Sequence, residues 1–312
     1  MHGNGTAKPA LKNLKSLPYG GASYVDNPEM DNVLLDILQR VTTDQVTNDL
    51  GIKDKFLERY VEWIKSTELN ALKGLDNFKV SAYSSGTSES FDKFYLKNHN
   101  RRFRCFKGEY MYHQVAWRNY FPDWKFIDEE PLAANDAVVI SLPFSDTGNP
   151  HNEMHVVLNE CDRLGIPVLI DMAYFGICHD IIVNLDRPCI TDVVFSLSKC
   201  FPVSHLRIGM RLTRTDDDDT LLVHHKTNYI NRLGAGVGLA LLDKFGPDWN
   251  YEQYSQNQRI FCNTLQLLES NTVIFGIDEG VRSEYNRGND TNRLNLSKYL
   301  HSGALPTEHY SA

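Results

Sequence analysis

The middle third of the chain alternates between strand and helix patterns, and this alternation narrows the available folds more than any other feature. AVVISLPF (137–144) is a nearly continuous apolar run, which is typical of a parallel strand covered on both faces. An amphipathic helix pattern covers 153–164, and the next two predicted strands are IPVLIDMAY (166–174) and DVVFSLSK (192–199). Strand, helix and strand at this spacing form a right-handed βαβ unit. The sequence therefore predicts an α/β protein with a mostly parallel sheet flanked by helices.

The flanking regions predict two further parts. At roughly 150 residues per domain, 312 residues indicate about two domains, or one large domain with a smaller one. Apolar spacing predicts helices at 30–41, 54–72, 220–233 and 251–269, and strands at 78–83, 124–127, 272–278 and 292–300. We expect an extended arm over 1–30, a large domain over 31–245, and a smaller α+β domain over 246–312 against which the arm packs.

Composition excludes several classes of protein. The chain has 32 basic and 40 acidic residues, a formal charge of −8, which argues against a nucleic-acid binder. No apolar run approaches the length of about 18 residues that indicates a membrane span, and the first residues lack the apolar core of a signal peptide. The six cysteines form no CxxC pair, and no zinc-binding pattern is present. We therefore expect a cytoplasmic protein with reduced thiols, no membrane contact and no metal site.

Polar residues gather where the predicted strands end. In open α/β sheets, ligands bind beyond the carboxyl ends of the strands, so these positions predict a binding site. Each group alone is weak evidence, because strand-end aspartates and loop lysines are often capping or solvated residues. The groups are, in chain order, Ser84-Ser85-Gly86-Thr87-Ser88, the loop from Ser145 to Pro150, Asp171 with Tyr174, and Ser196-Leu197-Ser198-Lys199 followed by Arg207.

This ordered set resembles the class I/II aminotransferases, the aspartate-aminotransferase-like enzymes of fold type I that use pyridoxal 5′-phosphate (PLP). The resemblance covers roughly residues 30–300 and is strongest over 137–212. It implies a PLP-dependent aminotransferase that acts on an amino acid and a keto acid, and a homodimer. With 113 residues after Lys199, the C-terminal lobe is expected to be shorter than is usual in the family.

The resemblance assigns three residues to catalysis. Lys199 matches the lysine that holds the PLP aldehyde as a Schiff base. Asp171 matches the carboxylate that keeps the ring nitrogen protonated, so that the ring withdraws electrons. Tyr174 matches the phenol that hydrogen-bonds the ring O3′. Lys226 and Lys244 are predicted to lie on helices and are poorer candidates for the reactive lysine.

The resemblance also implies donors for the cofactor phosphate and an aromatic ring that stacks on the cofactor. The phosphate donors are backbone N–H groups at a helix start, hydroxyls and a guanidinium. They are Gly86, Thr87, Ser88, Ser196, Ser198 and Arg207. By its spacing to the next strand, Tyr112 is the preferred stacking residue and Tyr110 the second choice.

One position departs from the family pattern. An asparagine normally begins the N-P-T-G loop and bonds O3′, whereas the register here places Ser145 at that point. Asn149 has the right side chain but lies four residues later. Both residues remain candidate cofactor contacts.

The substrate α-carboxylate is bound in the family by an arginine on a late strand. Arg293, in TNRLNLS, matches it, with Arg282 and Arg287 as competitors. Gly20 or Gly21 of the arm is a weaker candidate for closing over the same carboxylate. The same residues serve decarboxylation, elimination and cyclisation, and a non-catalytic module can retain the fold, so these alternatives stay open.

Overall fold

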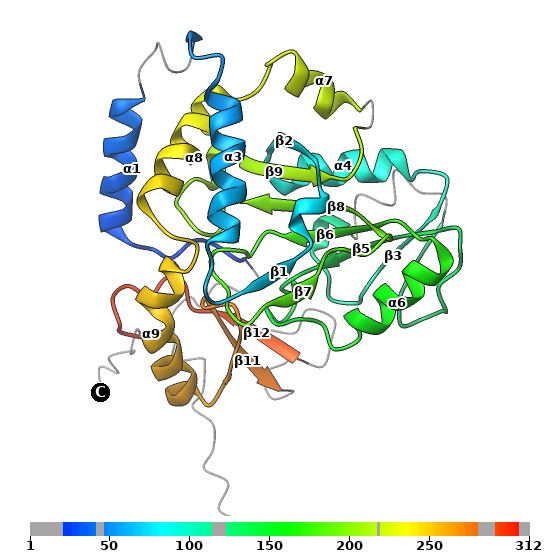
Figure 1. Cartoon of the computed structure of the whole chain (residues 1–312). Coiled ribbons are helices and arrows are strands. Elements are labelled where there is room, and N and C mark those ends of the chain that lie inside the picture. The colour runs from blue at the N-terminus through cyan, green and yellow to red at the C-terminus, as the bar shows by residue number, and fades with distance from the viewer. Residues whose placement is uncertain (1–20, 42–46, 114–122, 217–218, 280–290, 306–312) are drawn as a thin grey trace, which may run out of the picture.

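A seven-stranded sheet forms the centre of the large domain. The computed structural model describes residues 21–41, 47–113, 123–216, 219–279 and 291–305 (Figure 1). The strand order is β2 (Val80–Ser85), β9 (Ile208–Thr213), β8 (Ile190–Ser196), β6 (Val168–Met172), β5 (Asp136–Ser141), β3 (Arg102–Cys105) and β4 (Trp124–Phe126). Strand β9 is antiparallel to both of its neighbours, and the other paired strands are parallel. The predicted fold class is confirmed.

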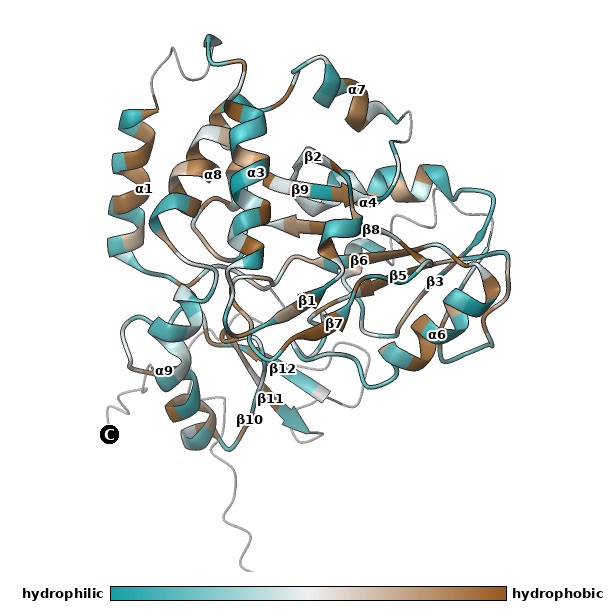
Figure 2. Cartoon of the chain, in the orientation of Figure 1, coloured by the Kyte–Doolittle hydropathy of each residue, from teal (hydrophilic) through white to brown (hydrophobic). Residues whose placement is uncertain are grey.

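Helices cover both faces of this sheet, which explains the unbroken apolar runs. On one face, Val138 and Ile140 pack in a core with α3 (Ile52–Lys65), α6 (Met154–Leu164) and α8 (Arg232–Lys244). On the other face, Val139 packs with α4 (Gly86–Lys97). Figure 2 shows hydrophobic residues along β5 and β6, whereas α6 is hydrophobic on one side only. Both faces of the central strands are therefore withdrawn from water.

A smaller lobe follows the large domain along the chain. It contains α9 (Trp249–Leu265) and an antiparallel sheet of β10 (Leu268–Glu269), β11 (Phe275–Glu279) and β12 (Thr291–Asn295). Its core includes Val25 from the arm, and the Asp26 N–H donates to the Ser297 carbonyl. The boundary proposed at 245/246 falls in the link between α8 and α9.

Short elements complete the described chain. Helix α1 (Pro28–Arg40) lies beside α8, and β1 (Ala71–Lys73) pairs in parallel with β7 (Ile182–Asn184). The remaining elements are α7 (Thr220–Lys226) and the 3-10 turns η2 (Leu75–Asn77) and η3 (Ser204–Leu206). Among these described residues, no helix combines the length and apolarity needed to cross a membrane.

Three predicted helices are wrong in extent. The helix predicted at 251–269 ends at Leu265, and β10 occupies the last two of its predicted residues. The helix predicted at 54–72 ends at Lys65, and β1 occupies part of its predicted span. The helix predicted at 220–233 is two helices, because Asn228 has a left-handed φ of 61° between α7 and α8. A backbone in that region cannot continue a right-handed helix. Strand β3 was not predicted.

The Gln258 side chain holds the small lobe together and gives a stability prediction. This buried amide on α9 donates to the carbonyls of Ser270 (2.9 Å), Thr272 (3.2 Å) and Phe275 (2.9 Å). Gln258→Leu removes the donor and leaves buried carbonyls unsatisfied, so we expect the free energy of unfolding to fall by about 2 kcal/mol in urea titrations. The exposed Gln253→Leu on the same helix is the control. Equal stability of the two variants would contradict this role.

Candidate active site

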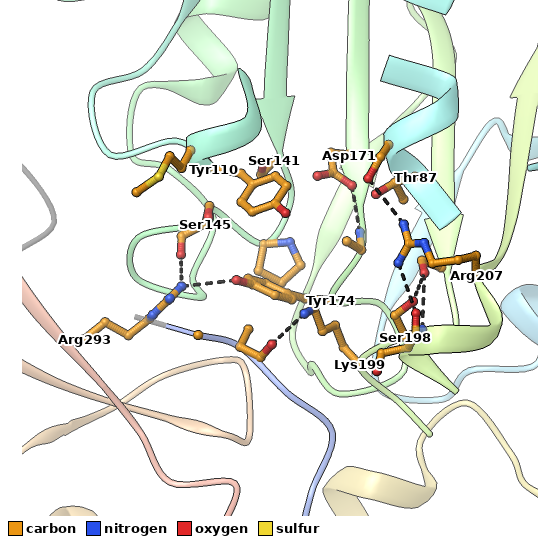
Figure 3. Close-up of a pocket in the computed structure, with 18 residues that line it drawn as sticks. Thr87, Tyr110, Ser141, Ser145, Asp171, Tyr174, Ser198, Lys199, Arg207 and Arg293 are labelled. Atoms are coloured by element: carbon orange, nitrogen blue, oxygen red, sulfur yellow. Dashed lines mark hydrogen bonds between the residues drawn. The ribbon is translucent and has the colours of Figure 1, made fainter. Parts of the chain in front are cut away.

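A cavity of about 410 Å³ lies beyond the ends of β5, β6 and β8 and is closed on one side by the arm. Its charged lining residues in the described chain are Asp171, Lys199, Arg207 and Arg293. Figure 3 shows Arg207 and Arg293 at opposite ends of the cavity, with Lys199 between them. The structure thus brings together residues that are separated by more than 100 positions in the sequence.

Most of the predicted site residues line this cavity. They are Gly21, Thr87, Ser88, Tyr110, Ser145, Asp171, Tyr174, Ser196, Ser198, Lys199, Arg207 and Arg293. Gly86 begins α4 at the cavity edge. Tyr112 and Asn149 do not line the cavity, and Gly20, Arg282 and Arg287 lie outside the described residues.

Lys199 lies three residues after the end of β8 and points into the cavity. Its Nζ donates to the Ala22 carbonyl of the arm at 2.5 Å. Burial lowers the pKa of the Lys199 amine below its usual range, and Arg293 and Arg207 lower it further, whereas Tyr174 and Asp171 raise it. A lower pKa leaves more of the amine neutral at a given pH, and the neutral amine is the nucleophile.

One end of the cavity gathers hydrogen-bond donors of the kinds that bind anions. Helix α4 begins here, and its first N–H groups have no partner within the helix. The Arg207 guanidinium donates to the Ser85 carbonyl at 3.1 Å and the Ser88 hydroxyl at 3.3 Å. Gly86 has a φ of +69°, and a Cβ at this position would collide with Arg207. The glycine therefore lets the helix start and the guanidinium converge.

Two serines add hydroxyls to this anion cradle. The Ser196 and Ser198 Oγ atoms lie 2.8 Å apart, and both side chains are buried. The Ser198 N–H also donates to the Ser196 Oγ at 3.2 Å, which fixes the turn that leads to Lys199. The two serine hydroxyls and Lys199 thus belong to one turn, residues 196–199.

Asp171 lies at the carboxyl end of β6, buried beside the cavity. Its Oδ1 accepts from the Ala173 N–H at 3.0 Å. The Nε2 atom of His113, which is fully buried, lies 3.9 Å from the Asp171 Oδ2. Sequence reasoning missed His113, because segment 110–113 was examined only for a stacking ring. A histidine directly after a candidate tyrosine was the available signal.

The opposite end of the cavity contains the Arg293 guanidinium, buried on β12. Its Nη1 donates to the Ser145 carbonyl and, at 3.1 Å, to the Tyr174 hydroxyl. The guanidinium carbon lies 4.2 Å from the centre of the Phe275 ring. Ser145 thus contacts the site through its backbone as well as lining it.

Two predicted positions need correction. The Tyr112 hydroxyl donates to Asp92 at 2.8 Å and its ring packs on Phe91, so Tyr110 is the tyrosine that lines the cavity. The Asn149 side chain accepts from the Asn271 N–H at 2.7 Å and secures the small lobe to the loop. The Asn149 side chain is therefore hydrogen-bonded outside the cavity, and Ser145 lines the cavity instead.

Comparison with known proteins shows the fold. No protein-family model matches the chain, and no curated protein matches it in sequence. Among solved structures, the PLP-bound C-S lyase from Staphylococcus hominis is 12% identical, with a TM-score of 0.67 over 96% of this chain and 93% of the lyase. The aromatic aminotransferase from Pyrococcus horikoshii is 11% identical, with a TM-score of 0.64 over 93% of each chain.

A third neighbour extends the comparison. The histidinol-phosphate aminotransferase from Clostridium acetobutylicum is 13% identical, with a TM-score of 0.59 over 89% of this chain and 93% of that chain. The chain shares the fold of these three enzymes, as the ordered motifs predicted.

The Lys199 environment gives a pH-dependent prediction. We expect reductive methylation of Lys199, followed by peptide mass spectrometry across pH, to reach its midpoint at lower pH in the folded protein than in urea. The reason is that burial lowers the pKa of the amine only in the folded state. The same lysine in the unfolded chain is the control, and equal midpoints in the two states would contradict the assignment.

Proposed function

We propose that this protein is a PLP-dependent enzyme that transfers the amino group of an amino acid to a keto acid. The observation that carries the proposal is the cavity itself, in which a lysine with a lowered pKa lies between an anion cradle and a buried arginine. The fold shared with PLP-bound solved structures supports the same cofactor.

The residues present fit the cofactor. The cradle of α4, Ser198 and Arg207 suits a phosphate, because it combines helix N–H groups, a hydroxyl and a guanidinium. Gly86 leaves open the space that a Cβ would fill. Asp171 at the cavity suits a protonated ring nitrogen, because its carboxylate accepts the N–H hydrogen bond, and Tyr110 offers a ring at the cavity wall. When bound, PLP supplies an electron sink for charge that develops at the substrate Cα.

Each of this chain's groups then has a defined task. Lys199 holds the cofactor through its amine and, once released, moves the proton at the substrate Cα as general acid and base. Tyr174 donates a phenol hydrogen bond near the reacting centre. Arg293 binds the α-carboxylate and orients the Cα–H bond. The Ala22 carbonyl, 2.5 Å from Nζ, orients the lysine amine.

A second candidate is PLP-dependent elimination at a carbon–sulfur bond. The observation that favours it is the likeness to the Staphylococcus hominis C-S lyase, together with Ser145 at the loop position where transaminases carry asparagine. A lysine and a carboxylate clamp serve both reactions. After removal of the Cα proton, elimination would break the bond between Cβ and sulfur and release a thiol, whereas transamination would leave that bond intact and transfer the amino group. Decarboxylation and cyclisation share the same apparatus.

We further propose a homodimer in the cytoplasm that acts on an amino acid and a keto acid as small-molecule substrates. All six cysteines are free and buried, which supports a reducing compartment.

The Cys105 thiol is a poor nucleophile, because burial raises its pKa well above the ordinary value.

Product analysis tests the reaction type. With PLP bound, we expect amino donors to yield keto acids and the pyridoxamine form of the cofactor, and Lys199→Ala to lose both the reducible chromophore and turnover. Lys226→Ala, which removes an exposed lysine paired with Asp216, is the control. Pyruvate and ammonia released from cysteine-like substrates, with no pyridoxamine, would favour the lyase. Normal turnover in Lys199→Ala would exclude the proposed role of this lysine.

Substitution of Arg293 tests the carboxylate clamp. Arg293→Lys keeps the charge but loses the planar pair of donors, so we expect KM for amino and keto acids to rise about 10- to 100-fold. Cofactor absorbance should be unchanged, because the phosphate donors lie at the other end of the cavity. Arg259→Lys on the exposed side of α9 is the control. An unchanged KM in Arg293→Lys would mean that another group binds the carboxylate.

A further inference from the structure

A second carboxyl group, that of Glu109, is buried behind the cavity wall and has no task in the proposed mechanism. Its Oε1 accepts from the Ser141 N–H at 2.7 Å, and its Oε2 accepts from the Ser141 hydroxyl at 2.6 Å and from the Tyr110 N–H at 3.2 Å. Ser141 and Tyr110 both line the cavity, whereas Glu109 is 1% exposed and does not. Glu109 therefore contacts two lining residues from inside the protein.

The Ser141 hydroxyl lies beside the acidic group of the cavity. Ser141 is the last residue of β5 and is the register partner of Asp171 on the parallel strand β6. Register partners on neighbouring strands place their side chains on the same face of a sheet. Both residues line the cavity, and Figure 3 shows them on the same side of it. A ligand group at Asp171 is therefore also close to the Ser141 hydroxyl.

The charge of Glu109 determines how Ser141 can bind a ligand. A serine hydroxyl has one proton to donate and two lone pairs that accept. While Glu109 is ionised, the hydroxyl donates its proton to Oε2, so only its lone pairs are left for a ligand. When Glu109 is protonated on Oε2, the carboxyl group donates to the Ser141 Oγ instead, and the hydroxyl proton turns toward the cavity.

The same hydrogen bond gives Glu109 a route for proton exchange. A proton that reaches the Ser141 Oγ from the cavity forms a new O–H bond, and the original hydroxyl proton moves to the Glu109 Oε2. The carboxylate becomes a neutral carboxyl group, and Ser141 stays neutral. The O–O distance of 2.6 Å is in the range of hydroxyl–carboxylate hydrogen bonds. The N–H groups of Ser141 and Tyr110 do not offer such a route, because backbone amides keep their protons.

The surroundings of Glu109 favour the uptake of this proton. Burial raises the pKa of Glu109 and the negative charge of Asp171 raises it further, whereas His113 and the hydrogen bonds from Ser141 lower it. Cys105 on β3 also interacts electrostatically with Glu109, but burial raises the pKa of that thiol well above its ordinary value, so it is neutral. Because the net effect is a raised pKa, Glu109 is protonated at higher pH than an exposed glutamate is.

We infer that Glu109 is a positioning residue that acts through Ser141: by taking up or releasing one proton through the Ser141 hydroxyl, it switches that hydroxyl between hydrogen-bond donor and acceptor beside Asp171. A positive group bound at Asp171 offsets the negative charge that favours protonation of Glu109, so its binding releases that proton. This consequence rests on the proposed function, in which the cofactor ring nitrogen binds Asp171. The exchange between Glu109 and Ser141 depends only on this chain's own residues.

Infrared spectroscopy of the cofactor-free protein tests the exchange. With ¹³C-labelled glutamate, we expect a carboxyl C=O band that is lost in Glu109→Gln and that appears at higher pH than the bands of exposed glutamates. Ser141→Ala should move this band to higher frequency, because the carboxyl O–H loses its acceptor. Glu58→Gln, at an exposed position on α3, is the control and should leave the band unchanged.

Two infrared results would overturn the inference. One is the absence of a Glu109 carboxyl band throughout the pH range in which the protein stays folded. The other is a Glu109 band that Ser141→Ala does not shift. If Glu109→Gln does not fold, the shift in Ser141→Ala identifies the band, because Ser141 is the hydrogen-bond partner of Glu109.

Calorimetry with pyridoxine 5′-phosphate tests the consequence. This ligand has the ring nitrogen and the phosphate but no aldehyde, so it forms no Schiff base with Lys199. Titrations in two buffers of different ionisation enthalpy, at the pH of the infrared midpoint, give the number of protons released on binding. We expect the parent to release more than Glu109→Gln, by up to about 0.5 proton per chain.

The outcomes of this titration separate the two proposals. Equal proton release by the parent and Glu109→Gln would overturn the coupling between Glu109 and the ligand at Asp171. Failure of the parent to bind the ligand would contradict the proposed function alone, and the infrared bands would still decide whether Glu109 exchanges its proton through Ser141.

Discussion

The site depends on the charges that line its cavity. Among the described residues, these are three basic side chains and one acidic side chain. Arg207 and Arg293 contribute +2 against −1 from Asp171, and Lys199 adds a further positive charge when it is protonated, in a protein whose total is −8. Positive charge in a cleft attracts anions, and burial strengthens the attraction. A ligand with a phosphate at one end and a carboxylate at the other matches the two arginines. The low pKa of Lys199 is a consequence of the same arrangement, since burial and two neighbouring cations favour its neutral form.

The order of the motifs allowed much of the fold and site to be predicted. Apolar runs at 137–144 and 166–174 indicated buried parallel strands, and parallel strands bring their carboxyl ends to one edge. Asp171 and Lys199 therefore came together without any contact being visible in the sequence. Arg293 required the family resemblance, because its strand belongs to a different sheet.

The rest depended on side-chain direction and on contacts between distant segments. Tyr110 and Tyr112 are only two residues apart, and their rings stack with centroids 6.2 Å apart, so spacing to a strand does not choose between them. His113 acquires its neighbours from α4 and β6, and Ala22 meets Lys199 across 177 positions. Asn149 has the expected amide, but Asn271 engages it in the folded chain. Local sequence specifies none of these pairings.

The central claim is that this cavity binds PLP through Lys199. The most direct measurement is borohydride reduction of the protein after incubation with PLP, followed by peptide mass spectrometry. The account predicts one phosphopyridoxyl group per chain, on the peptide that contains Lys199, with Lys226 and Lys244 unmodified. Labelling spread over exposed lysines, with Lys199 unmodified, would contradict it.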